Sequence, residues 1–147
     1  MSADAARPAG GGPARSARLD ELAGERWESG LEWRPVRHQL GIEAFGAGAW
    51  LGDRGVELIE EHTELVENAD EHEELYLVVS GRATFTVAGE AIDAPAGTFV
   101  AVPDPAASRR AVAEEDGTAI FAVGAPRGRP YELSPWERKR LERRDPA

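Results

Sequence analysis

Two short groups of histidine and glutamate hold the side chains of this sequence that could do chemistry. His62 and Glu64 are separated by one residue, and His72, Glu74 and Tyr76 follow with the same alternate spacing. Because successive side chains of a β-strand point to opposite faces, alternate residues share a face. Imidazole and carboxylate groups bind Fe, Mn or Zn ions, and they also pair with polar ligands. Each group is therefore expected on one face of a strand, where it could serve a metal site or a polar binding site.

The second group begins a stretch, residues 72–103, whose pattern predicts four consecutive strands. Residues 74–79 are rich in leucine, tyrosine and valine, which suit a mostly buried strand. Ser80-Gly81 predicts a two-residue hairpin turn, because glycine adopts positive φ at little cost. Residues 83–87 alternate threonine with apolar side chains, and turns are expected at Gly89 and at residues 95–97.

Further strands are expected on both sides of this stretch. They lie at residues 33–40, 42–51, 56–64, 109–113 and 118–123, and the last two form a hairpin around Asp116-Gly117. Residues 65–71 are expected to form an acidic loop. Eight or nine short strands at turn spacings of about 8–12 residues predict an all-β fold, a single jelly roll. The residues expected in its core are Phe85, Val87, Phe99 and Ile120.

The chain divides into four parts by composition. Residues 1–18 are predicted to be a disordered tail, residues 19–41 an N-terminal arm with the first strand, and residues 42–124 the barrel. Residues 125–147 are predicted to be a C-terminal tail with a short basic helix. That helix is expected from Ser134 to about Arg143, because serine is a good N-cap and proline suits the first helical position.

Composition and charge exclude several classes of partner. The 147 residues include no cysteine, so disulfides and thiolate metal ligands are excluded. A net charge of −10 argues against nucleic acid and anionic membranes as partners, because phosphates would be repelled. The N-terminus lacks the apolar core of a signal peptide, and no segment is apolar enough to span a membrane, so a cytoplasmic location is expected.

The central stretch resembles the paired motifs of the cupin family. Glu74 followed by six residues and Gly81 matches the end of the first motif, and Gly97 followed by five residues and Pro103 matches the start of the second. The resemblance covers about residues 42–124 and implies a cupin-type double-stranded β-helix. The metal-binding pattern is depleted, since three positions of the second motif depart from it: Pro105, Ser108 and Val112.

The resemblance leaves two alignments for the histidine pair of the first motif. One places Asn68 and Asp70 at the histidine positions, and the other places His62 and Glu64 there, on a regular strand. We favour the second alignment. The resemblance then implies that His62, His72 and Glu74 converge inside the barrel as candidate ligands of Fe, Mn or Zn. It also implies a ligand pocket around them that includes four further residues: Glu64, Tyr76, Ser108 and Arg110.

Glu74 has an alternative to a metal ion. A carboxylate in a buried strand must be paired, liganding or protonated, and Arg109 or Arg110 could supply the pairing charge. Two functions follow. In the first, the chain is a small cupin that binds a small polar ligand in its barrel. In the second, it is a metal-dependent enzyme of the oxygenase or isomerase type.

Both faces of the strand at residues 74–79 are apolar. Tyr76 and Val78 lie on one face, and Leu75 and Leu77 lie on the other. A jelly roll has one interior, so the second face needs a cover. That cover is expected to be the tryptophans of residues 19–41 or a second subunit, and the resemblance to cupins implies a homodimer.

Overall fold

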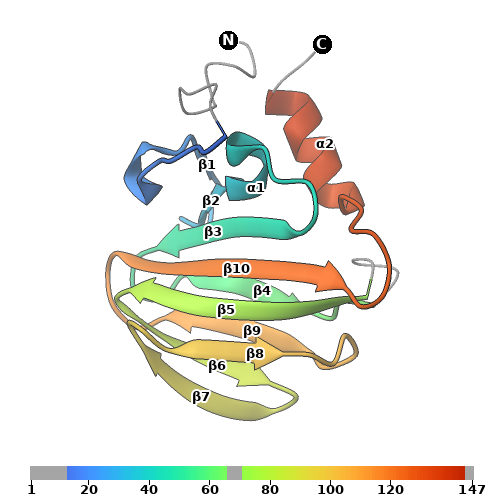
Figure 1. The fold of residues 1–147 in the computed structure, drawn as a ribbon. Coiled ribbons are helices and arrows are strands. Elements are labelled where there is room, and N and C mark those ends of the chain that lie inside the picture. Colours follow the sequence, from blue (N-terminus) through green and yellow to red (C-terminus); the bar gives the residue numbers. More distant parts are fainter. Residues whose placement is uncertain (1–12, 66–70, 145–147) are drawn as a thin grey trace.

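Two antiparallel sheets face each other in the computed structural model, which describes residues 13–65 and 71–144 (Figure 1). The larger sheet has the strand order β1-β2-β3-β10-β5-β8. Its strands are β1 (Glu25–Arg26), β2 (Glu32–Arg34), β3 (Gly46–Gly52), β10 (Thr118–Pro126), β5 (His72–Ser80) and β8 (Phe99–Val102).

The smaller sheet has the order β4-β9-β6-β7 and closes the barrel from behind in the view of Figure 1. Its strands are β4 (Glu57–His62), β9 (Arg109–Ala113), β6 (Arg82–Val87) and β7 (Glu90–Pro95). From β3 to β10 the chain passes repeatedly from one sheet to the other. The predicted all-β jelly roll is therefore confirmed, and β5 to β8 are the four strands expected from residues 72–103.

The core lies between the sheets and includes two of the predicted residues, Phe85 and Ile120, while the predicted Val87 is partly buried and packs against it. The prediction for Phe99 is wrong, because that side chain is 63% exposed. In β8 the residues that point into the barrel are Val100 and Val102. The sequence shows an alternation in this strand but not which of its two faces is covered.

The predicted strand at residues 33–40 ends early. Pro35 has no backbone N–H to donate, and β2 stops at Arg34. Residues Val36–Leu40 form the helix α1, which ends at Gly41 with a φ of 72°. The left-handed conformation of Gly41 is the common end of a helix. The arm at residues 19–41 thus adds β1 and β2 to the larger sheet.

Two predicted hairpins, at Gly81 and at Gly117, are wrong. Gly81 has a φ of 73°, as expected for a tight turn, but β5 and β6 belong to different sheets and do not pair. The turn at Gly117 likewise carries the chain from β9 in the smaller sheet to β10 in the larger one. Tight-turn chemistry predicts a change of direction, and it does not determine which strands then pair.

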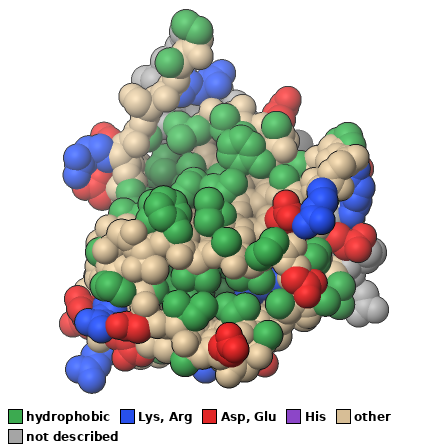
Figure 2. Space-filling model, turned by 60° about the horizontal axis from the view of Figure 1, so that its bottom comes forward, with side chains coloured by type: hydrophobic (Ala, Val, Ile, Leu, Met, Phe, Trp, Pro, Cys, Tyr) green, Lys and Arg blue, Asp and Glu red, His purple; other side chains and the backbone are tan. Residues whose placement is uncertain are grey.

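The outer face of the larger sheet is apolar over β5 and β8. Leu75 is 41%, Val79 47% and Phe99 63% exposed, and hydrophobic side chains gather on the face seen in Figure 2. Trp33, from the arm, is buried on the opposite face of the sheet, where it pairs with Trp50. Of the two predicted covers, the arm therefore leaves this outer face exposed.

The predicted C-terminal helix is confirmed as α2 (Pro135–Arg144), which lies beside α1 above β3 (Figure 1). Of the tail predicted to be disordered at residues 1–18, residues 1–12 lie outside the described residues, as do residues 66–70 of the predicted acidic loop. None of the helices in the described part of the chain is both long and apolar enough to cross a membrane.

Candidate ligand site in the barrel

A cavity of about 490 Å³ lies inside the barrel, above a floor of small residues. Gly46 and Gly48 of β3 lie opposite Gly124 and Ala122 of β10, and all four line the cavity. A Cβ atom added to Gly124 would lie 3.2 Å from Cγ of Glu74, closer than ordinary contact. The absence of side chains at these glycines lets Tyr131, Trp33 and Glu74 of the cavity lining lie close to the backbone of β3 and β10.

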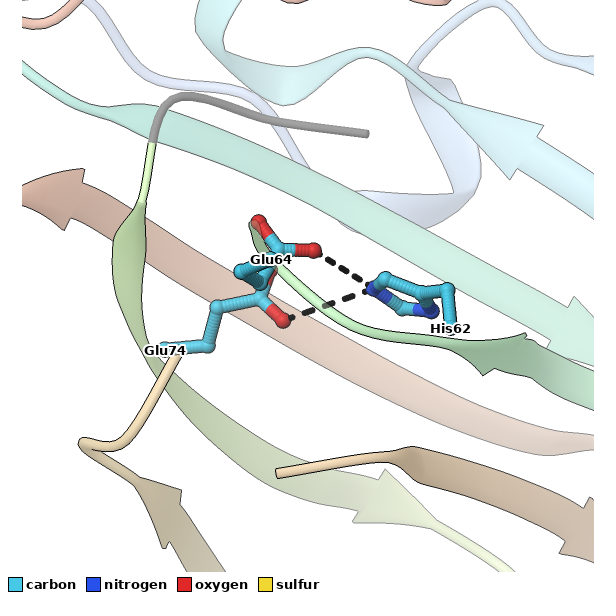
Figure 3. Close-up of side chains that lie close together, drawn as sticks. All are labelled: His62, Glu64 and Glu74. Carbon is cyan, nitrogen blue, oxygen red and sulfur yellow. Dashed lines mark ion pairs between the residues drawn. The ribbon is translucent and has the colours of Figure 1, made fainter. Parts of the chain in front are cut away.

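The polar end of the cavity joins β4, the segment after it and β5. His62 Nε2 lies 2.6 Å from Oε2 of Glu64 and 3.7 Å from Oε1 of Glu74, as the dashed lines in Figure 3 show. His62 Nδ1 lies 2.7 Å from the carbonyl oxygen of Glu60. One imidazole therefore lies between two carboxylates, and its other nitrogen donates to the backbone.

Arg109 supplies a second cation at this end. Its side chain is fully buried, and its NH1 group donates to Oε1 of Glu74 at 2.9 Å. Its remaining N–H groups donate to the carbonyl oxygens of Asp104 and Ala107, at 3.1 Å and 2.8 Å for NH2. The guanidinium is thus held in place by three residues.

Because successive side chains of β9 point to opposite faces, the next arginine, Arg110, lies on the other side of the sheet. Arg110 lies 2.7 Å from Glu57 in an ion pair whose side chains are 40% and 36% exposed. Sequence analysis weighed both arginines as partners of Glu74 and placed Arg110 in the pocket. In the structure Arg109 pairs with Glu74 behind the cavity lining, and Arg110 pairs with Glu57 at the surface.

The pKa values of this cluster reflect burial and pairing. Burial alone would lower the pKa of His62, but its hydrogen bonds with Glu64, Glu74 and the Glu60 backbone outweigh burial and raise the pKa to about 10. Burial acts to raise the pKa of Glu64, and hydrogen bonds from His62 and His72 hold it below the usual value. His62 is thus an imidazolium at neutral pH. With Arg109, it balances the two carboxylates.

His72 stands slightly apart from the other predicted ligands. Its Nδ1 lies 3.5 Å from Oε1 of Glu64, its ring lies against Tyr131 with centroids 5.2 Å apart, and its buried Nε2 has no hydrogen-bond partner among the described residues. Within the described part of the chain, the side chains with donor atoms within 4.8 Å of one another are His62, Glu64 and Glu74. That trio could hold a metal ion, and it contains Glu64 where the sequence predicted His72.

The remaining predicted pocket residues separate in space. Tyr76 lines the cavity, and its hydroxyl group donates to Oε1 of Glu74. Burial is the main cause that raises the pKa of the Tyr76 hydroxyl well above its usual value, and the nearby charge of Glu74 acts in the same direction. The hydroxyl group therefore remains a donor. Ser108 and Arg110 are absent from the described residues that line the cavity.

The other end of the cavity is an aromatic wall that sequence analysis did not predict. It consists of Trp27, Trp33, Trp50 and Trp136, which are all the tryptophans of the chain. Trp33 and Trp50 are stacked with centroids 6.2 Å apart, and Trp136 of α2 lies 5.1 Å from Trp33. One signal was visible in the sequence: every tryptophan lies outside the central stretch at residues 72–103.

Segments beyond the barrel also bring Tyr131 and Glu137 to the cavity. Burial raises the pKa of Glu137 to about 7, and the charges of Arg37 and His72 act in the opposite direction. Oε2 of Glu137 is buried and lacks a hydrogen-bond partner in the described structure, since Arg37 Nε is 3.8 Å away. A polar atom of a ligand or solvent molecule could bond to it.

No family model and no curated protein matches this chain. Solved structures match it in fold. KdgF from Halomonas sp. is 23% identical with a TM-score of 0.60, over 75% of this chain and 93% of that one. An RmlC-like cupin from Shewanella frigidimarina is 21% identical with a TM-score of 0.59, over 76% and 91%. A sugar phosphate isomerase from a cupin superfamily, from Silicibacter pomeroyi, is 16% identical with a TM-score of 0.58, over 74% and 73%. The chain therefore has the cupin fold.

Proposed function

We propose that this protein binds a small polar organic molecule in the barrel cavity, without needing a metal ion. The observation that carries the proposal is the ion pair between the buried Arg109 and Glu74 at the polar end of the cavity. A guanidinium already neutralises the carboxylate that a metal ion would need, and its charge repels a second cation. Close to this ion pair, Nε2 of the buried His72 has no hydrogen-bond partner among the described residues and is available to a ligand.

Tryptophan fluorescence offers a direct test, because every tryptophan of the chain lines the cavity. A panel of small polyols, carboxylates and amines should include compounds that change the emission with saturation. Replacing Ala122 by Leu would fill the cavity floor and should abolish the response. Ala101→Leu is the matched control, because Ala101 is an exposed residue on β8 of the same sheet and does not line the cavity. Saturable binding that survives Ala122→Leu would place the ligand elsewhere and contradict the proposal.

The second candidate function is a metal-dependent enzyme, of the oxygenase or isomerase type. It is favoured by the trio of His62, Glu64 and Glu74, whose donor atoms lie within reach of one ion. Fe, Mn or Zn bound there would polarise an oxygen atom of a substrate held in the cavity. His62 would first have to lose its proton, and Glu74 would have to share its charge with Arg109. Glu74→Gln separates the two candidates: it removes a metal ligand in the second and a counter-charge in the first.

We further propose that the protein forms a homodimer through the outer face of β5 and β8. Leu75, Val79 and Phe99 expose apolar area on a regular sheet, and contiguous apolar patches are typical of subunit interfaces. A cytoplasmic location stays a prediction from the sequence.

A further inference from the structure

The side chains that face the cavity are acidic and aromatic. The lining includes five glutamates and two histidines: Glu60, Glu61, Glu64, Glu74, Glu137, His62 and His72. Lysine and arginine are absent from the described lining. Arg109 lies beyond Glu74, and Arg37 lies beside Glu137. A ligand in the cavity therefore meets carboxylates first, with the arginines one layer behind them.

The aromatic wall already holds a cation on one of its rings. The guanidinium of Arg140 lies 4.6 Å from the ring centroid of Trp27, within the range of a cation–π contact. Indole is the strongest aromatic partner for a cation, because its π face carries the most negative potential. Trp33, Trp50 and Trp136 extend the same wall along the cavity.

Two buried polar atoms of the cavity lining lack a hydrogen-bond partner among the described residues. Oε2 of Glu137 is buried without a hydrogen-bond donor in the described structure, and its ion-pair partner Arg37 Nε lies 3.8 Å away. Nε2 of the His72 imidazole is also buried and lacks a partner among the described residues. His72 is only 6% exposed. Buried polar atoms without partners are rare in proteins, so both atoms point to hydrogen bonds that a bound molecule completes. The Glu137 oxygen can accept a hydrogen bond from a ligand, and a positively charged donor suits its carboxylate.

From these observations we infer that the cavity takes an organic ammonium ion, the protonated form of an amine. Its N–H groups would donate to Glu137, and its hydrocarbon body would lie on the tryptophan rings. A polar group of the same molecule would pair with Nε2 of His72. This inference rests on the proposed function and names the class of its ligand.

The test uses three compounds with one branched alkyl body: 3-methylbutylamine, 3-methylbutan-1-ol and 3-methylbutanoate. At about pH 8 the amine is a cation, the alcohol is neutral and the acid is an anion. Isothermal titration calorimetry with the full chain should show that the amine binds about tenfold more tightly than the alcohol, as expected for a cation in a partly desolvated aromatic site. The carboxylate should bind most weakly.

Two variants complete the test. Glu137→Gln keeps the shape and removes the charge, so it should abolish the preference for the amine over the alcohol. Glu142→Gln, an exposed position on the same helix, should leave the preference unchanged. The inference is overturned if the amine fails to bind, if the alcohol or the carboxylate binds as well, or if the preference survives Glu137→Gln. If the three compounds bind equally and Ala122→Leu abolishes their binding, the inference fails while the proposed function stands.

Discussion

Replacing Arg109 by Met should strongly destabilise the fold. The change keeps an unbranched stem and removes a fully buried guanidinium, leaving the Glu74 carboxylate with only 15% of its side chain exposed and without its closest cation. It also removes the donors to the Asp104 and Ala107 carbonyl oxygens. Removing one partner of a buried ion pair costs about 3–5 kcal/mol, so the free energy of unfolding should fall by about that amount.

Arg110→Met provides a control on the same strand. Arg110 pairs with Glu57 at the surface, and an exposed pair contributes about 0–1 kcal/mol. Equilibrium urea denaturation measures both losses in the free energy of unfolding, with the same m-value, the slope of that free energy against urea concentration. The double change of Arg109→Met with Glu74→Gln should recover part of the loss, because it removes the unpaired charge as well. If Arg109→Met costs no more than Arg110→Met, the buried ion pair is not what stabilises this end of the cavity.

Three further predictions concern the network, the cavity floor and the assembly. The pKa of His62 is about 10 in the folded protein and 6.5 ordinarily, so its charge stabilises the fold. The free energy of unfolding that it adds relative to His62→Gln should be full below about pH 6.5 and should be lost as the pH rises through about 10. Urea denaturation that shows no such loss would contradict a protonated His62. Gly124→Ala should cost about 1–3 kcal/mol, because the new Cβ crowds Glu74, and a change near zero in the same assay would show that the side chain moves freely. Light scattering at micromolar concentration should give the mass of two chains for the natural protein and of one for Phe99→Lys; the mass of one chain for both would rule out the proposed dimer.

The sequence predicts the barrel well because its signals are local. Alternating side chains and glycine turns identify β5 to β8, and alternate spacing places His72, Glu74 and Tyr76 on one face of β5. Which strands pair across the sheets depends on distant contacts, so Gly81 was read as a hairpin turn. The same limit applies to Phe99, since a strand's pattern does not tell which of its faces meets the core.

The candidate site was only partly predictable for a related reason. Adjacent arginines on a strand point to opposite faces, and the sequence alone could not choose Arg109 over Arg110 as the partner of Glu74. Trp136 and Glu137 come from a helix that, on its own, reads as a basic surface helix. They reach the cavity only because α2 packs on tryptophans more than 80 residues earlier in the chain.

Metal content tests the central claim most directly, because the two candidate functions differ in their need for an ion. Elemental analysis of the protein, purified without chelators and then equilibrated with Fe²⁺, Mn²⁺ or Zn²⁺, would be compared with that of Glu74→Gln. If Arg109 already neutralises Glu74, both proteins should contain far less than one ion per chain. One tightly held ion per chain in the natural protein, lost in Glu74→Gln, would contradict the claim and establish the trio of His62, Glu64 and Glu74 as a metal centre.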